Sequence, residues 1–90
     1  MSKTLEQLRD EIQREFIGGR YDGVTATEKI LTKIVGQSVD FYDTCIDDGV
    51  DGEDTYVMKD CFVSKDDSVV IRIYYGDVTE EIGYVSVSNR

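Results

Sequence analysis

The sequence predicts an α+β fold, in which two N-terminal helices pack on one face of an antiparallel meander sheet of three or four strands. Before Gln37, apolar residues recur every three or four positions, which is the spacing of one helix face. After Gln37, short segments are rich in β-branched and aromatic residues. Ninety residues supply one core, so we expect a single domain, 1–90, with a helical part, 1–37, and an acidic sheet part, 38–90.

The first helix is expected to begin after Thr4. Thr4-Leu5-Glu6-Gln7 has the form of a capping box, in which the Thr and Gln side chains bond free amides of the first turn. The apolar residues that follow share one helix face and are Leu5, Leu8, Ile12 and Phe16. Gly18-Gly19 would end this helix.

A second, shorter helix is expected after residue 24. Thr25-Ala26-Thr27-Glu28 also has capping-box form, and Gly36 is the expected C-terminal cap. The apolar stripe between them consists of Ile30, Leu31, Ile34 and Val35. The connection 18–24 has the length typical of an antiparallel helix pair.

Three strands are predicted at 56–63, 68–75 and 82–88, and the short segments between them favour hairpins. The segment 39–46 leaves two interpretations open. Ser38 could cap a helix there, or the segment could be a strand paired with residues 55–63. The sequence favours the strand, which gives the order α-α-β-β-β-β.

Alternation along the strands predicts which side chains face the helices. In the third strand the inward residues are Val69, Ile71, Ile73 and Tyr75, and the outward residues are Val70, Arg72 and Tyr74. In the last strand Val85 and Val87 would point inward, which leaves Tyr84 and Ser86 outward beside Tyr74 and Arg72. Tyrosines are therefore expected on the outer face of the sheet.

The phasing of the second predicted strand is open. The favoured choice sends Val57, Cys61 and Val63 inward and Tyr56 outward. The opposite choice buries Met58 and Phe62 and exposes Lys59. In the first strand, Tyr42 points outward if Phe41 is buried.

The charge of the chain is segregated, with a formal net charge of −9 at pH 7. Residues 1–37 carry six acids and six bases, whereas residues 38–90 carry thirteen acids and four bases. The stretch 40–54 contains no Lys or Arg, and its seven carboxylates are Asp40, Asp43, Asp47, Asp48, Asp51, Glu53 and Asp54. A field of one sign speeds encounter with a cationic partner and opposes direct binding of nucleic acid. The pattern indicates a protein-binding module.

The composition argues against catalysis. The chain has no His, which removes the commonest general base, and most acids stand in polar turn contexts where solvent keeps them ionised. Its two cysteines, Cys45 and Cys61, are too few for a zinc cluster; we expect buried reduced thiols, with a disulfide as the alternative. We therefore expect no enzyme, no cofactor and no structural metal.

Part of the acidic segment is similar to a calcium loop, because Asp51-Gly52 occupy positions five and six counted from Asp47. Position three is Gly49, and position twelve is Met58 where a bidentate Glu is required. A solvated hairpin loop is favoured, and a weak cation site at 47–54 stays open as the alternative.

No targeting segment is expected. No apolar run approaches the roughly 18 residues that a membrane span needs, and the start MSKTLEQLRDE has no apolar segment of a secretion signal. We therefore expect a cytoplasmic protein without membrane contact.

In size, in its acidic stretch 40–54 and in its aromatic and acidic strand half, the chain resembles the small acidic inhibitors that phages and mobile elements direct against host enzymes. These include anti-CRISPR proteins and DNA mimics such as the uracil-DNA glycosylase inhibitors. The resemblance implies that the protein occupies a basic nucleic-acid channel, for example in an RNA-guided nuclease of a host cytoplasm. Bacterial nuclease-immunity proteins are similar in size and charge and are the alternative within the same class.

The leading hypothesis is a stoichiometric inhibitor, monomeric or weakly dimeric, that docks on the basic surface of a nucleic-acid-binding enzyme. The candidate contact residues combine carboxylates with outward tyrosines and are Asp40, Asp43, Asp47, Asp48, Asp51, Glu53, Asp54, Tyr56, Tyr74 and Tyr84. The hypothesis from another class is a small structural or assembly subunit, in which the acids serve solubility.

Overall fold

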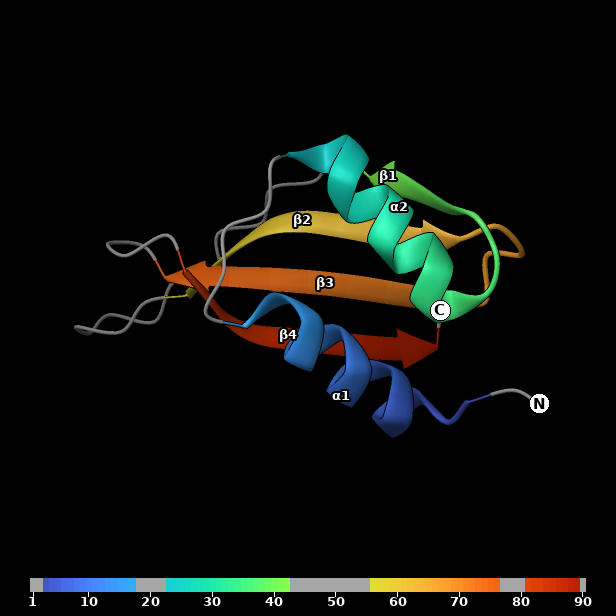
Figure 1. The fold of residues 1–90 in the computed structure, drawn as a ribbon, viewed down its shortest axis with the longest axis horizontal. Coiled ribbons are helices and arrows are strands. Elements are labelled where there is room, and N and C mark those ends of the chain that lie inside the picture. Colours follow the sequence, from blue (N-terminus) through green and yellow to red (C-terminus); the bar gives the residue numbers. More distant parts are fainter. Residues whose placement is uncertain (1–2, 18–22, 43–55, 77–80, 90) are drawn as a thin grey trace.

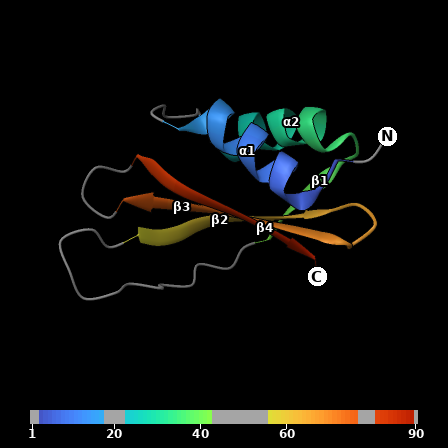
Figure 2. The same cartoon turned by 90° about the horizontal axis from the view of Figure 1, so that it is seen from below.

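The computed structural model describes residues 3–17, 23–42, 56–76 and 81–89, and it contains two helices followed by four antiparallel strands (Figure 1). The helices are α1 (Leu5–Phe16) and α2 (Val24–Val35). The strands are β1 (Val39–Tyr42), β2 (Tyr56–Ser64), β3 (Val69–Gly76) and β4 (Ile82–Asn89). The sheet order β1-β2-β3-β4 is a meander, and both helices lie on one of its faces (Figure 2). The predicted fold class is confirmed.

Helix α1 begins as the sequence predicts. Thr4 Oγ1 accepts a hydrogen bond from the Gln7 amide at 3.1 Å, and Gln7 Oε1 accepts one from the Thr4 amide at 3.0 Å, so the capping box is complete. The helix buries Leu8, Ile12 and Phe16. It ends at Phe16 with Ile17 as C-cap, and Gly18-Gly19 lie outside the described residues.

Helix α2 begins before the predicted capping box Thr25-Ala26-Thr27-Glu28, so the prediction that this box caps the helix is wrong. Its first residue is Val24, its N-cap is Gly23 with φ 112°, and no side chain caps it. Thr27 is fully buried one turn before the fully buried Leu31, and its hydroxyl donates to the Gly23 carbonyl at 2.9 Å. The Thr27 amide donates to the same carbonyl at 3.1 Å, and this i→i−4 bond makes Gly23 rather than Thr25 the N-cap.

The C-terminal end of α2 agrees with the sequence. Gly36 has φ 84°, and its amide bonds the Thr32 carbonyl at 2.9 Å. This left-handed conformation favours glycine because it lacks Cβ. The cap turns the chain into β1.

The segment 39–46, for which the sequence allows a helix or a strand, is a strand in its described part. Val39–Tyr42 pairs antiparallel with residues 61–64. Val39 is fully buried, and Phe41 contacts Phe62 edge to face with ring centroids 5.5 Å apart. Tyr42 is 45% exposed, as expected for a strand that turns Phe41 toward the core.

The favoured phasing of β2 is wrong for Cys61 and Val63. Phe62 is the residue that enters the core under the helices, whereas Cys61 and Val63 pack with Met58 and Val70 on the opposite face. Register shifts between Met58 and Asp60, and this bulge places Met58 on the same face as Cys61. Alternation restarts after the bulge, so neither phasing from the sequence holds along the whole strand.

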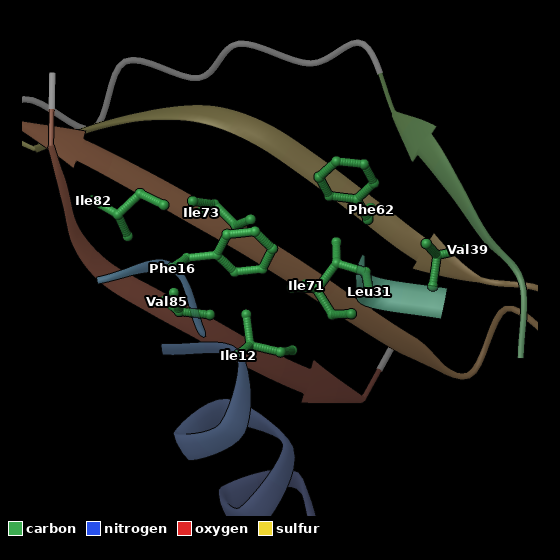
Figure 3. Packing of buried hydrophobic residues seen from close by; sticks show 9 residues of the cluster. All are labelled: Ile12, Phe16, Leu31, Val39, Phe62, Ile71, Ile73, Ile82 and Val85. Atoms are coloured by element: carbon green, nitrogen blue, oxygen red, sulfur yellow. The ribbon is translucent and has the colours of Figure 1, made fainter. Parts of the chain in front are cut away.

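The main core lies between the sheet and the two helices (Figure 3). Helix α1 packs on β4, and α2 packs on β1 and β2. The buried side chains of this core are Ile12, Phe16, Leu31, Val39, Phe62, Ile71, Ile73, Ile82 and Val85. The phasing predicted for β3 and β4 is confirmed, since Ile71, Ile73 and Val85 are all fully buried.

A hydrogen-bonded turn joins β2 to β3. Asp66 Oδ1 accepts bonds from the Ser68 hydroxyl, from the Ser64 hydroxyl at 2.8 Å and from the Ser68 amide at 3.1 Å. The Lys65 amide donates to the Ser38 carbonyl at 2.8 Å, which ties the turn to the start of β1. The hydroxyls of Ser68 and Ser64 lower the pKa of Asp66 to about 2 because their bonds favour its ionised form.

Mutation of the capping box at Thr4, which forms, should destabilise the protein more than mutation of the box at Thr25, which does not form. Thr4→Ala removes a formed cap and should lower the free energy of unfolding by about 1 kcal/mol. Thr25→Ala lies in a box that does not form, and it should change that free energy by less than about 0.5 kcal/mol. Urea unfolding followed by circular dichroism measures both. Equal losses for the two variants would contradict the observed start of α2.

The Asp66 turn predicts a pH-dependent contribution to stability. The pKa of Asp66 is lower in the folded chain, about 2, than its ordinary value of 3.8, so its stabilisation is present above pH 4 and declines as the pH falls toward 2. The urea midpoint of Asp66→Ala should therefore lie below that of the wild type at pH 6, with the gap narrowing at pH 3. Lys65→Ala is the control from the same turn. A gap that is unchanged at pH 3 would argue against the ionised carboxylate.

Candidate partner-binding surface

The ten candidate contact residues fall into two groups. The structure describes Asp40, Tyr74 and Tyr84, and it places Tyr56 as the first residue of β2. The others lie outside the described residues and are Asp43, Asp47, Asp48, Asp51, Glu53 and Asp54. The described part of the candidate surface therefore consists of sheet residues.

The sheet face away from the helices, which we call the outer face, is defined by the strand register. One row across it runs from Tyr42 through Cys61 and Arg72 to Ser86. A second row runs from Asp40 through Val63 and Val70 to Ser88, and a third joins Met58, Tyr74 and Tyr84. The apolar members of these rows, Met58, Cys61, Val63 and Val70, are buried. The exposed members of the rows are Asp40, Tyr42 and Tyr84.

Tyr74 and Tyr84 form a ring pair on this face. They are register partners on β3 and β4, and their ring centroids lie 5.2 Å apart at an interplanar angle of 51°. Tyr84 is 48% exposed, whereas Tyr74 is half-buried and packs against the apolar cluster of the outer face. The predicted outward placement of both tyrosines, side by side, is confirmed.

Arg72 also lies on the outer face, as the alternation predicts. Its Nη1 donates to the Ser88 hydroxyl at 3.3 Å, which directs the guanidinium along β3 away from Tyr74. Asp40 is exposed on β1. Among the described residues of the three rows, Asp40 and Arg72 are the charged members, so this part of the outer face is close to neutral.

Tyr42 is a surface residue that the list of candidate contacts left out. It is 45% exposed on the outer face, in the row that also holds Arg72. The alternation of Val39 and Phe41 against Asp40 and Tyr42 is the signal in the sequence that identifies it.

Most of the charge belongs to sequence segments that join the strands. The described residues contain ten acids and eight bases, whereas 43–55 and 77–80 together contain eight acids and no base. The first segment leads into the start of β2, and the second links the end of β3 to the start of β4. These strand ends lie together at the end of the sheet that carries the Tyr74–Tyr84 pair (Figure 1). Both charged segments thus connect to a nearly neutral scaffold at these strand ends, and 43–55 also connects to the end of β1.

A shallow groove of about 280 Å³ lies on the opposite side of the molecule, between α1 and α2. It is lined by Lys3, Glu11, Arg14, Glu15, Lys33 and Ile34. Lys3 Nζ forms an ion pair with Glu11 and donates to the Ile34 carbonyl at 3.3 Å. Charges of both signs line the groove and part of them satisfy one another, so it offers no field of one sign to a ligand.

A hydrogen bond between Tyr75 and Asp60 lies on the helix side of the sheet. Tyr75 donates its phenol hydrogen to Asp60 Oδ2 at 3.0 Å, and burial raises the pKa of the Tyr75 phenol. Tyr75 packs against the main core, so we interpret this bond as part of the packing. Within the described ranges, no three His, Cys, Asp or Glu side chains gather as metal ligands do.

Comparison of the chain with protein-family models, curated proteins and solved structures finds no match. Neither helix of the described chain has the length and apolar character to cross a membrane.

Proposed function

We propose that the protein is a stoichiometric inhibitor that binds the cationic nucleic-acid-binding surface of an enzyme. One observation carries this proposal: the segments 43–55 and 77–80, which hold the excess negative charge in the sequence, connect to the strand ends at Tyr56, Gly76 and Ile82, close in register to the Tyr74–Tyr84 pair. An RNA-guided nuclease is one enzyme with such a surface, and a nuclease bound by an immunity protein is another. The site of action is the cytoplasm.

The charge supports the proposal through its sign and its density. Carboxylates accept charge-assisted hydrogen bonds from Lys and Arg as phosphate oxygens do. The segment 43–55 places six of them in thirteen residues without a base. A surface that binds nucleic acid is rich in Lys and Arg and attracts such a segment over about one Debye length, roughly 8–10 Å at physiological salt.

The scaffold supports the proposal by its rigidity. The main core ties both helices to all four strands, and β2 and β3 contribute buried residues on both faces. Tyr84 therefore stands on backbone that loses little freedom when it is covered. Tyrosine also supplies a large contact area at a low entropic cost.

A structural subunit is the second candidate, and β4 is the observation that favours it. β4 is an edge strand of eight residues, Ile82–Asn89, without a charged residue or a proline, which are the usual protections of an edge. Helix α1 packs along this strand, which limits the approach of another chain. Sedimentation at micromolar concentration separates the two: the inhibitor is expected as a monomer, and a defined oligomer supports the subunit.

Capture from a bacterial lysate on the immobilised protein tests the leading proposal. Nucleic-acid-binding enzymes should be retained at about 50 mM salt and released at about 500 mM, because the Debye length falls severalfold between them. Duplex DNA should compete for the captured enzyme. Asp47→Lys with Asp48→Lys should weaken its binding about tenfold or more, since like charges then meet across the interface.

Glu6→Lys with Glu15→Lys is the matched control, since it changes the net charge equally but alters exposed positions of α1. This variant should keep most of the affinity. Capture that resists high salt, or equal losses from the two charge-reversed variants, would overturn the assignment of the acidic segment.

A further inference from the structure

We infer that the exposed ring of the Tyr74–Tyr84 pair selects arginine over lysine in the cationic partner. This inference rests on the proposed function and adds the chemistry of one contact within it. It concerns described residues of β3 and β4, and it does not require a particular arrangement of the acidic segment.

The ring pair has the geometry of a docking platform. Tyr74 holds Tyr84 from one side with centroids 5.2 Å apart, while 48% of Tyr84 remains exposed. Tyr74 in turn packs on the buried cluster of Met58, Cys61, Val63 and Val70. A bound side chain would therefore meet an aromatic surface that is already positioned.

The sequence between the two tyrosines carries acids and no base. The segment 73–89, which contains both tyrosines, includes the acids Asp77, Glu80 and Glu81 and no Lys or Arg. Glu81 is exposed three residues before Tyr84, and its carbonyl accepts the Gly76 amide at 2.8 Å across the hairpin. The hairpin thus combines an aromatic surface with negative charge.

Two arginines of the described chain, Arg72 on the outer face and Arg9 on α1, are already bonded within the chain. Arg72 Nη1 donates to Ser88, as described above. Arg9 of α1, whose charge also interacts with the Tyr84 phenol, is bound by Asp10 through Nε at 3.3 Å and Nη2 at 2.9 Å. The guanidinium that occupies the exposed side of Tyr84 would then come from another molecule.

The side-chain chemistry favours arginine. A guanidinium is planar and weakly hydrated, so it stacks on an aromatic face while its edges bond carboxylates. The lysine ammonium is compact and strongly hydrated, and it gains less from the same ring. A cation–π contact at an exposed site changes an affinity by about two- to fivefold.

Titration calorimetry with two peptides, a deca-arginine and a deca-lysine, tests this inference on the full chain. The wild type and Tyr84→Phe, which keeps the ring, should both prefer the arginine peptide. Tyr84→Leu should reduce that preference by about two- to fivefold, because its affinity for the arginine peptide should fall more than its affinity for the lysine peptide. Circular dichroism of each variant verifies the fold.

The outcomes separate this inference from the proposed function. If both peptides bind and Tyr84→Leu leaves the preference for arginine unchanged, the ring does not select arginine and the inference is overturned alone. If neither peptide binds the folded wild type at low salt, the cationic partner itself is ruled out, and the inference falls with it.

Discussion

The two central strands are buried on both faces, and the rest of the structure depends on this constraint. β2 sends Phe62 under the helices and Cys61 and Val63 to the outer face, while β3 does the same with Ile71 and Val70. A slip of one residue would exchange the two sets, so the register is strongly specified. The same register places Tyr74 opposite Tyr84, and the ring pair is therefore a consequence of core packing.

Local sequence signals correctly predicted the elements that have a clear cap at one end or a clear alternation of polar and apolar residues. The capping box at Thr4 and the glycine cap at Gly36 identify helix ends. The alternation in β3 and β4 identifies the side of each strand that faces the helices. β2 was harder, because a strand buried on both faces reads as a nearly continuous apolar run without a visible inner side. The bulge between Met58 and Asp60 also shifts the register of β2, and a strict alternation of inward and outward residues does not predict such a shift.

The start of α2 shows the limit of a local capping signal. Thr25 and Glu28 have the right spacing for a box, but the Thr27 amide bonds the Gly23 carbonyl, so the helix begins at Val24. The Thr27 hydroxyl then bonds the Gly23 carbonyl, and Gly23 serves as N-cap without a side chain. The outward placement of Tyr74 and Tyr84 was predictable from alternation for another reason. Arg72 marks the outer side of β3, and Val85 marks the inner side of β4.

Charge and aromatic surface act over different distances, which gives them different roles in the proposed complex. The described scaffold, with ten acids and eight bases, is close to neutral, so most repulsion within the chain involves the joining segments rather than the core. Carboxylates act over about a Debye length and raise the rate of encounter, an effect that salt reduces. Tyr84 acts only in contact, and a contact of this kind mainly slows dissociation. In the proposed complex, long-range attraction would bring the cationic partner close, and contact with the exposed Tyr84 ring would then retain it.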